Sequence, residues 1–464
     1  MDEMRFEHRM SDADALMWTI EKDPLLRSTI TSVAIFDQAL DRARFMEAMD
    51  RCTRLVPRLR QRVMSNPMSI APPRWEVDPN YDPNFHIRFV RAAGSGQLRD
   101  VLDIAEPVAM GGFDRARPLW ELVVVEGLED GKSAVIMKLH HAITDGVGGI
   151  KIAMHLFDLD RDGGDKGPMP AAPEPQAWGQ LQRMIDAAQH EQRRQMGVAR
   201  RSLRTVTGAV GAVASDRSGT IERLRETLAS VGRMMAPATE PLSDVMTARS
   251  LSVRFDTIRI PLADLKAASK LAGGKLNDAF VAGVTGGLRE YHLRHGSSVK
   301  ALRMTMPINI RNEDTADLAG NQFAPARFPV PLDIDDPVER MTSIRSLVSD
   351  ARGEPALSLA EPLAAILYRL PASVSTGVFG SMLKGVDFVT SNVPGVPLPV
   401  FLAGARMEAQ FPFGPMSGSA ANITLLSYLD EVQIGVNTDP AAIPDTDVFV
   451  GCLRDGFAQV MKAE

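Results

Sequence analysis

Two adjacent histidines, His140 and His141, stand between an apolar run and a glycine-rich turn. The run, residues 133–139, favours a buried strand. Asp145 and Gly146 follow after three spacers, and glycine there lets the backbone bend tightly and other groups approach closely. The stretch beyond has the apolar spacing of a helix. We therefore expect the histidines where a strand ends and a loop begins, so the chain must fold around this strand–loop–helix unit.

Three roles compete for this unit. The histidines could be structural, which is the ordinary role of a lone histidine at a strand end. They could bind a metal ion with Asp145, but neighbours on an extended strand point to opposite faces, which disfavours one ion held by both. The third role is a single base. A neutral imidazole titrates near pH ~6.5 and can take a proton from an alcohol or thiol, with Asp145 as its support.

Length and composition limit the classes of protein. A chain of 464 residues exceeds one ordinary core, which predicts two or three domains. The formal net charge of −6 gives no sign of nucleic-acid binding. Cys52 and Cys452 lack metal-ligand spacing and form no disulfide framework, so we expect a reducing cytoplasm. The first residues lack the apolar core of a signal peptide and no apolar run approaches ~20 residues, so we expect a soluble or peripheral protein.

The composition divides the chain into three parts. Residues 1–160 mix strand and helix patterns and predict an α/β layer arrangement that carries the histidines. Residues 161–247 open with Asp, Gly, Pro and Ala, are low in strand signal, and read as a crossover linker. Residues 248–464 form a second α/β part. In the first part we expect strands at 28–36, 87–90 and 122–125, helices at 40–62 and 98–109, and an irregular stretch at 72–84.

The second part contains a long predicted helix that begins at a polar pair. Asn277 or Asp278 is expected to cap this helix, which reaches about Arg294. The remaining pattern predicts strands at 251–260, 302–310, 323–330, 386–393, 423–428 and 432–436, and helices at 337–351, 362–370 and 445–461.

The linker contains a basic amphipathic stretch, residues 177–205, with Trp178, Leu181 and Ile185 on one face. Two interpretations stay open. Such a helix suits the surface of an anionic bilayer or lipid droplet, or it is a crossover helix packed on the domains with its arginines solvated. The stretch has two acids, Asp186 and Glu191, and six basic residues: Arg183, Arg193, Arg194, Arg200, Arg201 and Arg204.

Together these segments resemble the bacterial wax ester synthase/diacylglycerol acyltransferase family over nearly the whole chain. Two departures, Asp12 and Val396 where the family often has proline, suggest a divergent member whose substrates differ. The motifs that carry the resemblance occur in the family's order: Ser11-x-x-Asp14, Pro118-Leu119-Trp120-Glu121, His140-His141-x-x-x-Asp145-Gly146, Asn277-Asp278, Pro307-x-x-x-Arg311, Gly320-Asn321 and Thr390-Ser391-Asn392-Val393-Pro394-Gly395.

The resemblance implies a fold and an activity. The fold would be two chloramphenicol-acetyltransferase-like α/β domains joined by a crossover, with a tunnel along their interface and His141 at its middle. The activity would be acyl-CoA-dependent O-acyl transfer to diacylglycerol or to a long-chain alcohol, with acyl-CoA as co-substrate and no cofactor. The protein would work in the cytoplasm or peripherally at the inner membrane or lipid droplets. Alternatives are another hydroxyl acceptor, such as a glycolipid or polyketide, or a non-catalytic lipid-binding homologue.

The resemblance also implies roles for single residues. His141 would be the general base, while His140 would be mainly structural. Asp145 would order the loop through an arginine or backbone partner, and Gly146 would permit close approach of the backbone.

The polar pair of the second half has more open roles. Asn277 would either bind the oxyanion that develops on the substrate or cap its helix. Asp278 would be structural.

Overall fold

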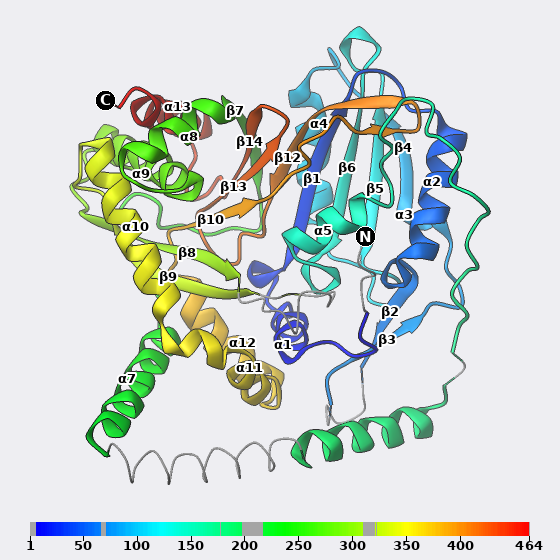
Figure 1. Cartoon of the computed structure of the whole chain (residues 1–464), viewed down its shortest axis with the longest axis horizontal. Coiled ribbons are helices and arrows are strands. Elements are labelled where there is room, and N and C mark those ends of the chain that lie inside the picture. Colours follow the sequence, from blue (N-terminus) through cyan, green and yellow to red (C-terminus); the bar gives the residue numbers. More distant parts are fainter. Residues whose placement is uncertain are drawn as a thin grey trace.

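The computed structural model describes residues 6–65, 71–176, 178–196, 217–309, 321 and 323–463. Two six-stranded sheets stand side by side with helices packed around them, and a hairpin of two short strands lies below the first sheet (Figure 1). Each sheet has its own apolar core, one built mainly from the second half of the chain and the other mainly from the first. The expected mixed α/β fold in two parts is confirmed.

The first sheet carries the histidine pair at the end of one central strand. Its strands are antiparallel to their neighbours except for the parallel pair at one edge, β4 and β5. Trp120, at the start of β5, is 2% exposed and donates from its indole to the Leu59 carbonyl at 2.7 Å, as expected of a core anchor. In spatial order the strands are β11 (Phe401–Leu402), β12 (Ala405–Phe413), β1 (Thr29–Phe36), β6 (Ser133–His140), β5 (Trp120–Glu126) and β4 (Ile87–Arg91).

Two of these strands, β11 and β12, come from the far end of the chain. β12 pairs antiparallel with β1 over Thr31↔Phe413 to Phe36↔Met407, so it completes the first sheet from the second half. Alternate residues of β12 are buried, which is the period of a strand with one face in a core. The sequence pattern predicted no strand at residues 405–413. The predicted domain boundaries at residues 160 and 248 do not account for a strand of the second half that joins the first sheet.

The second sheet comes wholly from residues after 248. β10 is parallel to both its neighbours, β13 and β8, and the remaining pairs are antiparallel. The two sheets touch closely: a Cβ on Gly435 of β14 would lie 1.8 Å from the carbonyl oxygen of Pro412 in β12. The spatial order is β7 (Arg254–Pro261), β14 (Glu431–Thr438), β13 (Ala421–Tyr428), β10 (Phe388–Val393), β8 (Ala301–Asn309) and β9 (Phe323–Pro331).

The helices largely follow the expected pattern. Ser11 caps the first helix through its hydroxyl, and the helix expected at 40–62 ends at Leu55, before Pro57. The stretch 72–84 is not irregular as expected, because it holds β3 (Arg74–Val77), paired with β2 (Gln61–Met64), and the start of α3. Apart from a helix at residues 180–196, the α-helices of the described residues are α1 (Asp12–Ile20), α2 (Arg42–Leu55), α3 (Pro83–His86), α4 (Leu98–Met110), α5 (Gly146–Ala153), α7 (Arg217–Met235), α8 (Leu262–Leu271), α9 (Leu276–Arg294), α10 (Pro337–Gly353), α11 (Ala360–Tyr368), α12 (Ala372–Leu383) and α13 (Thr446–Met461).

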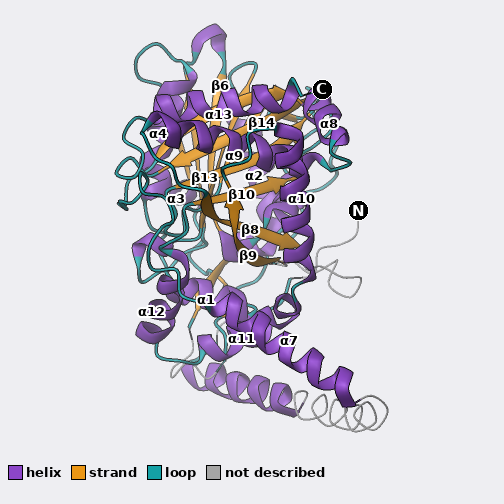
Figure 2. Cartoon of the chain, turned by 90° about the vertical axis from the view of Figure 1, so that its left-hand side faces the viewer, coloured by secondary structure: helices purple, strands orange, loops and turns teal. Residues whose placement is uncertain are grey.

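Within its described residues, the crossover contains two helices at the lower end of the molecule. One spans residues 180–196 and the other is α7, and both lie away from the sheets near α11 and α12 (Figures 1 and 2). The rest of the basic stretch, residues 197–205, falls outside the described residues.

Candidate active site around His141

The two histidines stand at the junction of a strand and a tight turn. β6 ends at His140, which is paired with Thr29 of the neighbouring strand β1. The turn His141–Ile143 follows as a 3₁₀ helix. The backbone N–H of His141 still donates to the Ser28 carbonyl at 2.8 Å, so β1 fixes the start of the turn. The predicted position at a strand end is confirmed.

His140 is enclosed in the first half. Its side chain has no exposed surface and lies between the rings of Trp18 and Phe113. Its Nδ1 accepts the Ala142 N–H at 3.0 Å, and its Nε2 lies 3.0 Å from Oε1 of Glu21. The ring is therefore held within the first half by a backbone hydrogen bond at Nδ1 and by the Glu21 carboxylate beside Nε2, and it has no exposed surface for a substrate.

His141 points the other way, toward the second half of the chain. Its Nδ1 lies 2.6 Å from Oδ1 of Asn321, and its ring packs 5.1 Å from that of Phe323. The Asn321 amide nitrogen donates to the His141 carbonyl at 2.9 Å and to the carboxylate of Asp14 on α1. Asp14 and Asn321 are buried, whereas His141 keeps partial access to solvent.

The surroundings of His141 favour the neutral ring. Burial lowers the pKa of His141 below its usual 6.5, although the hydrogen bond with Asn321 and the charge of Asp145 oppose that shift. A neutral imidazole whose Nδ1 faces an amide oxygen has one nitrogen, Nε2, for other chemistry. This is the protonation state that a general base needs.

Asp145 and Gly146 shape the turn after the histidines. Asp145 caps α5, because its Oδ1 accepts the Gly148 N–H at 2.9 Å, which is a backbone partner of the kind expected. A Cβ on Gly146 would lie 3.0 Å from both methyl carbons of Val393 in β10. Gly146 therefore allows close approach of a side chain from the second half.

Asn277 and Asp278, at the start of α9, have different roles in the structure. Asp278 caps the helix: its Oδ2 accepts the Lys275 N–H at 2.7 Å. Asn277 does not cap, and its amide donates to the sulfur of Met306 at 3.6 Å. Because thioether sulfur is a weak acceptor, this amide stays available to a better one. The described contacts do not join either residue to His141, so the oxyanion role of Asn277 stays a prediction.

Two residues of the site, Asp14 and Asn321, were noted in the sequence only as motif positions without a role. The signal that could have found them is their type, since a carboxylate and an amide at buried positions need polar partners. Neither position indicates which partner, because Asn321 stands 180 residues from His141 along the chain.

Other chemistries find no support in the described part of the chain. Burial raises the pKa of the Cys52 thiol to about 12 and also raises that of Cys452, so neither forms a thiolate nucleophile readily. Among the described residues, no group of three or more histidine, cysteine or acidic side chains is arranged to hold a metal ion.

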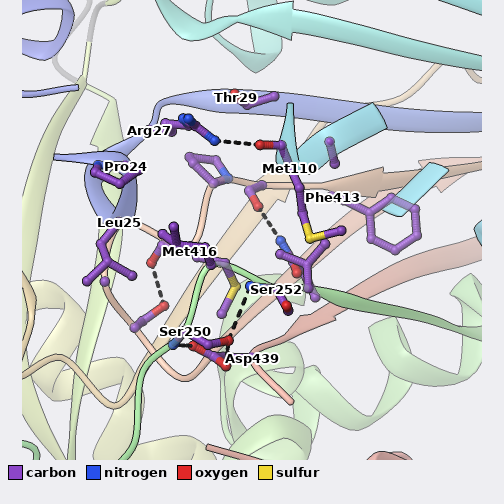
Figure 3. Close-up of a pocket in the computed structure, with 18 of the residues that line it drawn as sticks. Pro24, Leu25, Arg27, Thr29, Met110, Ser250, Ser252, Phe413, Met416 and Asp439 are labelled. Atoms are coloured by element: carbon purple, nitrogen blue, oxygen red, sulfur yellow. Dashed lines mark hydrogen bonds between the residues drawn. The ribbon is translucent and has the colours of Figure 1, made fainter. Parts of the chain in front are cut away.

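Two hollows lie near the seam between the halves. The one in Figure 3 is framed by Arg27 and Thr29 at the start of β1 and by Ser252, Phe413 and Asp439 from the second half. Its cavity of about 70 Å³ is far below the roughly 300–1,000 Å³ of small-molecule sites. The other, about 940 Å³ and open, lies between the loop after α1 and one face of α12. Neither is lined by His141, so the expected interface tunnel stays a prediction.

Comparison with known families covers most of the chain. Residues 10–280 match the family described as "Wax ester synthase/diacylglycerol acyltransferase catalytic domain", which includes the histidine motif. Residues 319–461 match "WS/DGAT C-terminal domain".

Individual proteins agree with this match. A Mycobacterium tuberculosis H37Rv protein that carries the provisional name of a diacylglycerol O-acyltransferase is 35% identical over 98% of this chain and 92% of its own length. The wax ester synthase/diacylglycerol acyltransferase from Marinobacter aquaeolei VT8 has a similar fold, with a TM-score of 0.61 at 21% identity over 97% of this chain and 98% of that one. The first condensation domain of the CDA synthetase also shares the fold, with a TM-score of 0.57 at 15% identity over 98% and 96% of the two chains.

Proposed function

Because the chain belongs to the wax ester synthase/diacylglycerol acyltransferase family, we propose that it moves an acyl group from acyl-CoA to a lipid hydroxyl. The proposed acceptors are diacylglycerol, which gives triacylglycerol, and a long-chain alcohol, which gives a wax ester. The mycobacterial relative bears the name of the first activity, and the Marinobacter structure bears the names of both.

The proposed reaction uses His141 twice. Its Nε2 takes the proton of the acceptor hydroxyl while that oxygen forms a bond to the thioester carbonyl carbon. The resulting oxyanion then collapses, the carbon–sulfur bond breaks, and the imidazolium returns the proton to the departing CoA thiolate. No acyl-enzyme is required, and both cysteines remain protonated.

One observation supports this role above the others. Burial lowers the pKa of His141, Asn321 holds its Nδ1 and the residue keeps partial solvent access, while its neighbour His140 is fully enclosed. Asn277 is the proposed donor to the oxyanion, because its amide contacts only a weak sulfur acceptor in the described structure.

The experiment is release of free CoA from palmitoyl-CoA, measured with and without diacylglycerol or hexadecanol. The proposal expects acceptor-dependent release with formation of the matching ester. Release that requires a different hydroxyl, such as a glycolipid, would keep the chemistry and change the acceptor. Tight binding of palmitoyl-CoA without release under any of these conditions would identify a non-catalytic lipid-binding protein.

We also propose that the lower end of the molecule docks on a lipid surface. In the helix 180–196, Leu181 is 70% and Ile185 49% exposed, so its apolar side faces outward. Figure 2 shows α7, α11 and α12 at the same end of the molecule as this helix. Further exposed apolar side chains are Met184 and Met196 on the same helix, Leu228 on α7, Ile366 on α11, Leu370 just after α11 and Val374 on α12. Among the described residues, no helix is both long and apolar enough to cross a bilayer.

The ion pairs of two arginines correct part of what was expected for the basic stretch, namely that its arginines are solvated. Arg183 forms a two-bond ion pair with Glu76 at 2.8 and 2.9 Å, and Arg194 lies 3.1 Å from Asp12. These arginines are solvated less than expected and hold the helix against the first half. The apolar side, rather than the arginines as a group, is therefore the proposed contact. Arg200, Arg201 and Arg204 lie outside the described residues.

Flotation with phosphatidylglycerol-containing liposomes tests the docking. The double variant Leu181→Ser/Ile185→Ser should bind more than about tenfold more weakly, since each buried side chain of this size contributes about 1.5–3 kcal/mol. Leu293→Ser, at a 50% exposed leucine on α9, is the matched control and should float like wild type. Equal flotation of the double variant and the control would show that lipid contact, if any, lies elsewhere.

A further inference from the structure

The contacts of Asn321 define which way its amide faces. Its nitrogen has two hydrogens, and each has an acceptor: the carboxylate of Asp14 and the carbonyl of His141. The amide oxygen is thereby left to face Nδ1 of His141, at 2.6 Å. Since neither acceptor can donate a hydrogen bond while Asp14 is ionised, a flipped amide would set its oxygen against two other oxygens.

An amide oxygen accepts hydrogen bonds and cannot donate one. The nitrogen that faces it, Nδ1, must therefore carry the ring proton, and the lone pair of neutral His141 must lie on Nε2. In the opposite tautomer Nδ1 would lack a hydrogen for Asn321, and Nε2 would have no lone pair to accept a proton. The buried position of Asn321 makes the loss of that hydrogen bond costly.

We propose that Asn321, fixed by Asp14, is a positioning residue that selects the Nδ1-protonated tautomer of His141. The unit joins three distant segments: α1, the end of β6 and the residue two before β9. The catalytic meaning of this tautomer rests on the proposed function, because a general base needs the lone pair on Nε2. The tautomer itself is a property of the folded protein whatever reaction it performs.

The test is ¹⁵N NMR of histidine-labelled protein at a pH where His141 is neutral, with the His141→Ala spectrum identifying its resonances. Wild type should show a protonated Nδ1 and an unprotonated Nε2. Asn321→Ala should show both tautomers, and its kcat should fall on the order of 10-fold or more with little change in KM, because ring orientation is lost too. Tyr291→Phe is the matched control, since it removes one part-buried side-chain hydrogen bond, from α9 to Asp445 just before α13, that involves no residue of the His141 site.

A second pair of variants tests the part played by Asp14. Asp14→Asn can still present an oxygen to the Asn321 N–H, and the His141 carbonyl still disfavours a flipped amide, so this variant should retain the wild-type tautomer. Asp14→Ala removes that acceptor, permits the amide to flip and should populate the other tautomer. A single unchanged tautomer in Asn321→Ala would overturn the proposal, and an unchanged one in Asp14→Ala would remove Asp14 from it. The two tests have separate meanings. An unchanged tautomer in the NMR spectra bears on Asn321 and Asp14, whereas failure of the acyl-transfer assay would overturn the proposed function.

Discussion

Adjacent histidines in this chain have opposite surroundings, because neighbouring side chains at the end of a strand point to opposite faces. His140 lies wholly among first-half residues, with a backbone hydrogen bond at Nδ1 and the Glu21 carboxylate beside Nε2, whereas His141 contacts Asn321 from the second half. The period of the strand predicts that the two residues differ. The partners that decide their roles come from elsewhere in the chain and cannot be read from the motif.

His140→Ala should therefore act mainly on stability. It removes a fully buried ring and leaves the Glu21 carboxylate and the Ala142 N–H without this partner. We expect a loss of about 2–4 kcal/mol in the free energy of unfolding, measured with denaturant. Turnover per folded molecule should remain well above that of His141→Ala. Unchanged stability would show that the enclosed ring contributes less than its contacts indicate.

Glu361 provides a prediction for pH. This carboxyl caps the first turn of α1 by accepting the N–H groups of Ala13 and Asp12, and burial, together with the charges of Asp14 and Asp12, raises its pKa from 4.5 to about 7. Between those values the folded state binds more protons than the unfolded state, so stability falls as pH rises through that window. The shift corresponds to up to about 3 kcal/mol.

Glu361→Gln keeps an oxygen acceptor and removes the titration. The variant should melt close to wild type at pH 5 and above it at pH 8. A melting-temperature difference that stays constant between these two pH values would contradict the assigned pKa shift.

At the scale of elements, α5 and β10 meet at one point beside the histidine turn. Gly146 begins α5, and Val393 ends β10 with its methyl carbons 3.0 Å from where a Cβ on Gly146 would lie. Gly146→Ala should destabilise the protein by about 1–3 kcal/mol, because valine is stiff and cannot turn aside. Val393→Ala should relieve part of that cost in the double variant. Additive effects of the two substitutions in thermal unfolding would argue against this contact.

The element that sequence analysis missed most clearly is β12. Its alternation of Ala405, Met407, Ala409 and Phe411 is that of a strand with one buried face. Alternation alone does not indicate which strand β12 pairs with, and its partner β1 lies more than 360 residues away along the chain. By contrast β6, α4 and α9 follow from local pattern and appear close to where it predicts them.

At the scale of the whole molecule, the two halves share structure rather than only a surface. β12 completes the first sheet, and Phe255 of β7 stacks on Phe413 of β12 with ring centroids 4.0 Å apart. From α4, Arg99 donates to the Phe255 carbonyl at 2.6 Å, and Glu106 accepts the Phe255 N–H at 3.0 Å. Neither half can therefore unfold without breaking contacts of the other.

We expect a single cooperative transition in differential scanning calorimetry, with matching calorimetric and van't Hoff enthalpies. Chains of this length often unfold in steps, so the expectation of one transition depends on β12, the second-half strand that belongs to the first sheet. Two resolved transitions would show that the halves unfold separately in spite of it.

The central claim is that His141 is the base of acyl transfer, and turnover of His141→Ala tests it most directly. Ester formation from palmitoyl-CoA and the acceptor that proves active should fall by on the order of 10²–10⁴-fold. The melting curve of the variant should match that of wild type, and Tyr291→Phe, assayed alongside, should keep its activity. Equal turnover in wild type and His141→Ala, with matched melting curves, would contradict the account.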